Sequence, residues 1–253
     1  MSGFGVLVRK ELLEQWRTFR LPVVALVFLL TGLGSPLLAR FTPEIVKAVA
    51  GDQIPIPLPA PTTAAAVDQL LKNLLQFGAL AAILLAMGAV ATEKERGTAA
   101  LILTSPASRG AFLAAKVVAL GSTLAAATAL ALAAAWVYTA LLFEPLPLPG
   151  FLGLGALAWL TLVAYGSFTF LGSTVTRSPV AAGALGFGAF LGLSILSALP
   201  RVADYLPGGL AGPARAVALG ETPVDVAAPL VGTLVLIAVT LGGAWLAFRR
   251  QEL

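Results

Sequence analysis

Six long apolar runs divide the chain, and shorter segments with charged, proline or glycine residues separate them. A helix needs about 20 mostly apolar residues to cross roughly 30 Å of hydrocarbon. None of the runs alternates apolar and polar residues as the strands of a membrane barrel do. The sequence therefore predicts an all-α polytopic membrane protein, with one transmembrane domain over residues 1–253. The six spans are expected at residues 21–38, 70–91, 112–143, 151–175, 179–199 and 226–248.

Composition supports this class and excludes several kinds of chemistry. Hydrophobic residues make up 58% of the chain and charged residues 11%, whereas a soluble domain averages about 25% charged residues. The chain contains no Cys and no His, which excludes disulfides, iron–sulfur clusters, zinc sites of these residues and histidine catalysis. It also lacks the G-x-x-x-x-G-K-[ST] phosphate loop, so any ATP that drives this protein is expected to bind another chain.

Basic residues predict the orientation. Segments 1–20, 92–116, 176–178 and 249–253 carry 11 of the 16 Lys and Arg residues. Because loops rich in Lys and Arg stay in the cytoplasm, we expect both termini on that side of the cell (inner or plasma) membrane. The net charge of +4 is then explained by orientation, and no nucleic-acid partner is expected.

Residues 1–20 are predicted to form an amphipathic helix that lies in the cytoplasmic interface of the membrane. Its apolar positions recur every three or four residues, and most of its charged residues fall on the other face. The apolar positions are Phe4, Val8, Leu12, Trp16 and Phe19, and the charged positions are Arg9, Lys10, Glu14 and Arg17. The alternative is an ordinary positively charged flank of the first span.

Proline dominates the outer segments. Alternate prolines from Pro55 to Pro61 disfavour a helix in the long outer loop at residues 40–69, and Thr62 or Thr63 can cap the helix that follows. A helix of one or two turns is expected between Pro213 and Gly220. The spans hold no acidic residue at their centres, which argues against proton- or sodium-coupled transport. Lys116 lies near the cytoplasmic end of the third span, and we expect it to extend toward the membrane surface.

The segment between the second and third spans carries the strongest functional pattern. Glu93 to Arg96 form a charged cluster just beyond the membrane, and Gly97 ends the helix of the span. Thr98 can cap a short helix over residues 99–104, whose Leu101 and Ile102 need a partner surface. Pro106 ends that helix, and Ser108 caps the next one. A merely solvated loop would not be expected to carry Leu-Ile-Leu in its middle.

These residues resemble a known family. Glu-Lys-Glu-Arg-Gly-Thr at residues 93–98, followed by Leu, Ser-Pro-Ala-Ser-Arg and a Lys seven residues on, is similar to the pattern of ABC transporter permease subunits of the type 2 exporter class. Arg-Lys-Glu-Leu at residues 9–12 is similar to the start of the interfacial elbow helix of that family. The basic C-terminus, Phe-Arg-Arg-Gln-Glu-Leu, is also similar.

The resemblance implies six transmembrane helices per subunit, an elbow helix, and a cytoplasmic coupling helix in the loop at residues 93–109 that docks on a separate ATP-binding subunit. The implied coupling residues are Glu93, Glu95, Arg96, Gly97, Thr98, Leu101, Pro106, Ser108 and Arg109. The implied elbow residues are Arg9, Lys10, Glu11, Trp16 and Arg17. The chain departs from members with large outer modules, because its loop between the fifth and sixth spans is short.

The expected function is that of a non-catalytic permease subunit that exports an apolar or amphipathic substrate. ATP and Mg²⁺ would bind the partner ATPase, and no cofactor is expected on this chain. The expected partners are a second permease subunit and the lipid bilayer. A homodimer is expected in preference to a heterodimer. An alternative is a subunit that relays ATP-driven motion to a periplasmic partner, as in copper-site maturation for nitrous oxide reductase. A more remote alternative is a membrane scaffold or enzyme without an ATPase.

Overall fold

The computed structural model describes residues 3–50, 60–98, 108–221 and 225–251. Its described residues form helices and connecting turns without any strand, and six helices are long and apolar enough to cross a membrane. The predicted all-α fold with six spans is confirmed. The long helices are α2 (Arg20–Ala50), α3 (Thr63–Met87), α6 (Arg109–Leu142), α7 (Leu148–Val175), α8 (Pro179–Leu196) and α11 (Ala227–Arg249).

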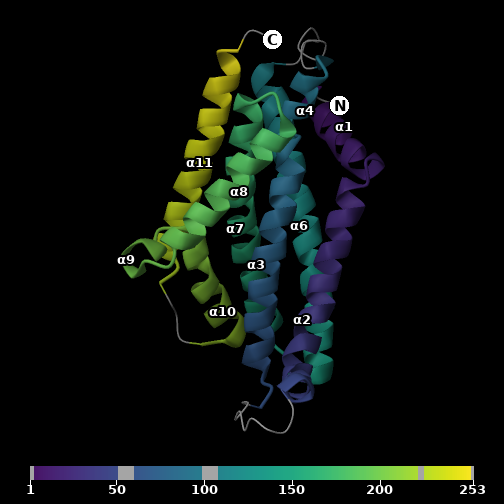
Figure 1. Ribbon diagram of the computed structural model, residues 1–253, viewed down its shortest axis with the longest axis vertical. Coiled ribbons are helices and arrows are strands. Elements are labelled where there is room, and N and C mark those ends of the chain that lie inside the picture. Colours follow the sequence, from purple (N-terminus) through teal and green to yellow (C-terminus); the bar gives the residue numbers. More distant parts are fainter. Residues whose placement is uncertain (1–2, 51–59, 99–107, 222–224, 252–253) are drawn as a thin grey trace.

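Shorter helices lie at one end and along one side of this bundle (Figure 1). Both chain ends lie at one end, here called the terminal end, together with α1 (Gly3–Arg17) and α4 (Ala91–Glu95). The other end is here called the distal end. On one side of the bundle, α9 (Pro200–Ala203) lies at about mid-height, and the chain continues through a 3₁₀ turn η1 (Pro207–Leu210) to α10 (Ala211–Leu219) in the distal half. An even number of long antiparallel helices brings the two chain ends to the same side.

The centre of the bundle is α7, which packs against α3, α6, α8, α10 and α11. Leu74, Leu124 and Leu162 are at most 1% exposed and join α3, α6 and α7 in the main core. A second cluster joins α10 to α3 and α7 through buried residues that include Ala214 and Ala218. The helix predicted before Gly220 therefore exists, and Gly220 ends it with a left-handed φ of 66°.

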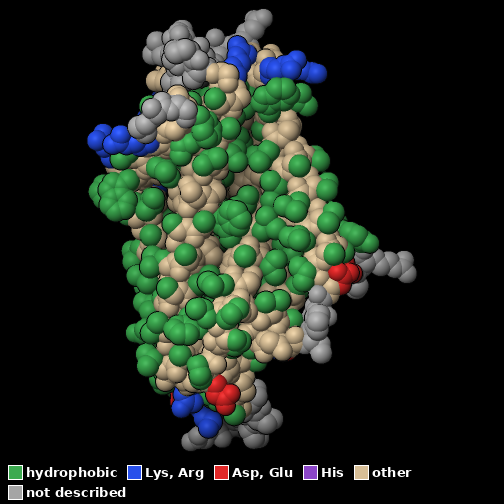
Figure 2. Space-filling model, turned by 180° about the vertical axis from the view of Figure 1, so that it is seen from behind, with side chains coloured by type: hydrophobic (Ala, Val, Ile, Leu, Met, Phe, Trp, Pro, Cys, Tyr) green, Lys and Arg blue, Asp and Glu red, His purple; other side chains and the backbone are tan. Residues whose placement is uncertain are grey.

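The outside of the bundle is apolar along its length. Figure 2 shows a long face covered largely by hydrophobic side chains, with most of the visible Lys and Arg residues near its two ends. Large side chains such as Leu30, Leu84 and Val239 are more than half exposed on long helices. Such a surface is stable in hydrocarbon and not in water, as the composition indicates.

Helix α2 continues to Ala50 and passes the predicted start of the outer loop at residue 40. It contains Pro36 and Pro43, each of which lacks the N–H that would bond a carbonyl one turn back. A hydroxyl precedes each proline and donates to a nearby carbonyl: Ser35 to Thr31, and Thr42 to Leu38. The carbonyls that the prolines leave without an N–H donor are those of Gly32 and Ala39, so these two hydroxyl bonds do not replace the lost ones. Membrane helices nonetheless tolerate proline. The prolines at positions 55, 57 and 59 lie outside the described residues.

The predicted helix starts are confirmed by their capping bonds. Thr62 Oγ1 accepts from Ala65 N at 3.1 Å at the start of α3, and Ser108 Oγ accepts from Ala111 N at 3.1 Å at the start of α6. Each cap satisfies a backbone donor that the first helical turn leaves unpaired.

Candidate functional site at the terminal end

The elbow segment forms helix α1, which meets α2 at a sharp corner. Phe19 stands at this corner with a left-handed φ of 59°, a conformation that is unfavourable for a residue with a side chain. Trp16 and Phe19 are 60% and 70% exposed, so they point away from the bundle. Glu11 is buried instead and faces α6.

Lys116 of α6 joins this elbow helix to the segment after α3. Its Nζ lies 3.0 Å from Glu11 Oε2 on α1 and 2.9 Å from Glu93 Oε1 on α4. All three residues are at least 91% buried, with exposed fractions of 4% for Lys116, 9% for Glu11 and 8% for Glu93. The expectation that Lys116 extends to the membrane surface is therefore wrong. A buried ammonium is stable where carboxylates neutralise it, and two are within reach.

Lys10 completes the cluster from the more open side. Its Nζ contacts Glu93 at 3.0 Å, Glu11 at 3.1 Å and Glu14 at 3.5 Å. Burial lowers the pKa of Lys10, but the carboxylates of Glu11 and Glu93 outweigh this and raise it above its ordinary value. Lys10 thus stays charged at physiological pH. These five side chains, Lys10, Glu11, Glu14, Glu93 and Lys116, are called the charge cluster below.

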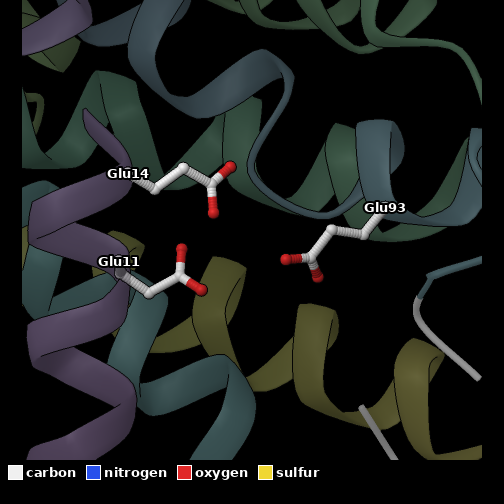
Figure 3. A group of neighbouring side chains, drawn as sticks. All are labelled: Glu11, Glu14 and Glu93. Carbon is white, nitrogen blue, oxygen red and sulfur yellow. The ribbon is translucent and has the colours of Figure 1, made fainter. Parts of the chain in front are cut away.

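The three carboxylates of the charge cluster turn toward one another (Figure 3). One oxygen from each of Glu11, Glu14 and Glu93 lies within 4.8 Å of the others, a spacing that can hold a metal ion. The Lys10 ammonium already contacts all three groups, so a metal ion would have to displace it. The arrangement therefore fits an internal ion-pair network better than a metal site.

A serine of α7 holds the base of α4. Helix α3 ends at Met87 and α4 begins at Ala91. At this break the backbone N–H groups of Val90 and Ala91 lose the carbonyl partners that a continuous helix would give them. Ser173 Oγ accepts from Val90 N at 3.0 Å and from Ala91 N at 2.9 Å, and donates to the carbonyl of Met87 at 2.9 Å. Ser173 is fully buried, so it caps α4 from another helix.

The C-terminal segment is hydrogen-bonded to the end of α7. Lys94 Nζ and Gln251 Nε2 both donate to the carbonyl of Thr174, at 2.7 and 2.9 Å. Arg109 donates to the carbonyls of Arg249 and Gln251, each at 3.1 Å. The start of α6, the base of α4 and the end of α11 therefore meet at one place.

The predicted coupling residues differ in whether they are exposed or face the bundle. Glu95, Arg96 and Gly97 are exposed, and Gly97 has a left-handed φ of 69° that ends the helix as expected. Thr98 is half-buried and donates to the carbonyl of Glu93 at 3.2 Å. Glu93 points inward into the charge cluster. The remaining predicted residues are Ser108 and Arg109, which are exposed, and Leu101 and Pro106, which lie outside the described residues.

The predicted elbow residues divide in the same way. Arg9, Trp16 and Arg17 are exposed, while Glu11 faces the bundle and Lys10 belongs to the charge cluster. The roles of Lys116 and Ser173 were not among the predictions from the sequence. The sequence did contain a signal for Lys116, because a lysine in a span is costly unless an acidic partner is near. Ser173 carried no such signal, since hydroxyls are common in these helices.

Comparison with known proteins agrees with this architecture. Residues 6–214 match the family described as "ABC-2 family transporter protein", which covers the chain from α1 into α10. The chain is also 30% identical over 213 residues to an uncharacterized transmembrane protein of Bacillus subtilis (strain 168), YxlG, across 82% of this chain and 81% of that protein. With six apolar helices and a family match over most of its length, the chain belongs to the ABC-2 family of transporter proteins.

Proposed function

We propose that this chain is the permease subunit of an ABC transporter and that a separate ATP-binding subunit docks on its terminal end, in the cytoplasm. The observation that carries the proposal is the exposed turn at Glu95, Arg96 and Gly97, within a chain of the ABC-2 family. In this proposal the turn and the residues that follow it contact the ATPase, and ATP with Mg²⁺ binds that partner.

The base of the turn is suited to transmit movement. Helix α4 is bonded to α7 through Ser173 and Lys94, and to α1 and α6 through Glu93. A segment held on three helices moves them when it is pushed, whereas a loosely attached loop would absorb the displacement. In this proposal the ATPase displaces the exposed turn, which acts as a lever, and the buried contacts pass the displacement to α1, α6 and α7.

The interior of the spans favours an apolar or amphipathic substrate. Among the described residues of the long helices, buried charge is confined to Lys116 near the terminal end, where it pairs with Glu11 of α1 and Glu93 of α4. The other buried polar groups described in these helices are Ser and Thr hydroxyls and the phenol of Tyr165. A charged substrate would need fixed counter-charges along its path. We propose export through a path that two copies of the permease form together.

The test reverses the two exposed charges without changing net charge, with Glu95→Lys and Arg96→Glu in one variant. A matched control, Glu44→Lys with Lys47→Glu, reverses two exposed charges on α2 at the distal end. We expect the first variant to lose co-purification with the ATP-binding subunit, or ATP-dependent transport, at least tenfold, while the control keeps both. Equal behaviour of the two variants would overturn the assignment of the docking turn.

A further inference from the structure

Burying the charged groups of the charge cluster costs free energy that apolar side chains in the same place would not cost. Glu93 Oε2 is buried and has no hydrogen-bond partner among the described residues. Buried ion pairs are often no more stabilising than apolar side chains of similar volume, and an unpaired buried oxygen is unfavourable. The feature that an apolar replacement could not reproduce is a fixed geometry among three separate helices.

That geometry centres on Lys116. Its ammonium bonds both oxygens of Glu11 at 3.1 and 3.0 Å and one oxygen of Glu93 at 2.9 Å. Its charge also lies 4.9 Å from the ring centre of Phe112, which stacks on Phe248 of α11. Contacts with Glu11, Glu93 and Phe112 leave the lysine little freedom, so it fixes where Glu11 and Glu93 stand relative to α6.

We propose that Lys116 is a positioning residue that holds the elbow helix and the base of the docking turn as one unit. The inference rests on the proposed function, because that unit is the lever on which the ATPase would act. Thr123 Oγ1 bonds Gln15 one turn further along α1, so the elbow helix is attached to α6 at two points. Without Lys116, α1 and α4 would each remain folded, but among the described residues the more exposed Lys10–Glu93 pair would be left as their ion-pair link, and both would lose their buried attachment to α6, so they would move together less.

The absence of native cysteine allows a direct distance measurement in the chain alone. Spin labels on Leu13→Cys of α1 and Glu95→Cys beyond Glu93 sit on exposed positions of the two segments. We expect a narrow distance distribution in the otherwise native chain and at least a twofold broader one with Lys116→Met. Lys116→Arg, which keeps the charge, should restore the narrow distribution. Ser122→Ala serves as the control on α6, because among the described residues this hydroxyl bonds the carbonyl of Ala119 in its own helix and no other group.

A second variant separates positioning from folding. Glu11→Gln, Glu93→Gln and Lys116→Met together leave no buried charge unpaired, so this chain should fold, yet its distances should be as broad as with Lys116→Met alone. In the complex with the ATP-binding subunit, Lys116→Met should keep the KM for ATP and lower the transport per ATP at least fivefold.

Two results would overturn the positioning role: an unchanged distance distribution with Lys116→Met, or no restoration with Lys116→Arg. Failure of the native chain to bind an ATP-binding subunit would instead overturn the proposed function. The spin-label distances would still decide the role of Lys116, because they are measured without any partner.

Discussion

Ser173 gives the sharpest stability prediction, because one hydroxyl caps two backbone donors of another segment. Replacing it with alanine leaves Val90 N and Ala91 N buried without their partner. A side-chain hydrogen bond in a membrane bundle contributes about 0.6–1.7 kcal/mol, and a buried donor left unpaired costs about 1–3 kcal/mol. For two donors, Ser173→Ala should lower the free energy of unfolding by about 2–4 kcal/mol.

The assay is unfolding of the detergent-solubilised chain by increasing SDS in mixed micelles, followed by tryptophan fluorescence. Ser194→Ala is the matched control, because Ser194 is exposed and, within the part of the chain that the structure describes, bonds no group but the carbonyl of Phe190 in its own helix. The control should change stability by less than about 0.5 kcal/mol. If the two variants unfold at the same SDS fraction, the reasoning that Ser173 holds α4 is refuted.

Three further predictions use the same unfolding measurement. Gly32→Ala should lower the free energy of unfolding by about 1–3 kcal/mol, because a Cβ would collide with the carbonyl of Ala131. Gly34→Ala is the control and should change stability little, because the space around Gly34 is open. Equal effects would contradict the close crossing of α2 and α6. Phe19→Gly should raise stability by about 0.5–1 kcal/mol by removing the left-handed strain at an exposed position, and a loss would contradict this. The carboxylate partners of Lys10 raise its pKa. The stability that Lys10 contributes is therefore fully present below its ordinary pKa of 10.5, and it is lost only as the pH rises through the higher pKa of the folded state. The difference between native chain and Lys10→Gln should therefore stay constant from about pH 7 to 9.5, and a decline within that range would refute the pairing.

The class and the helix starts could be predicted because they depend on local chemistry. Runs of apolar residues decide which segments can cross a membrane, and a hydroxyl before a helix decides where it begins, as at Thr62 and Ser108. The end of α2 could not be predicted in this way. Proline normally indicates a break, yet α2 runs through Pro36 and Pro43 to Ala50, because membrane helices tolerate proline.

The candidate site could be predicted in its location and not in its internal contacts. The charged pattern at residues 93–98 identified the segment, but it could not show that Glu93 turns inward while Glu95 and Arg96 stay exposed. That division depends on Lys116 and Glu11, which are 23 and 82 residues away along the chain and are brought together only by helix packing.

The central claim is that this chain works as the membrane subunit of an ATP-driven complex. The most direct test is to co-express it with a candidate ATP-binding subunit, purify through a tag on this chain, and measure ATP hydrolysis in lipid vesicles. The account predicts a stable complex whose hydrolysis rate differs at least several-fold from that of the ATP-binding subunit alone, and that loses this difference with Glu95→Lys and Arg96→Glu. The account would be contradicted if the chain purified alone after co-expression with each candidate ATP-binding subunit and left the ATP hydrolysis rate of those subunits unchanged.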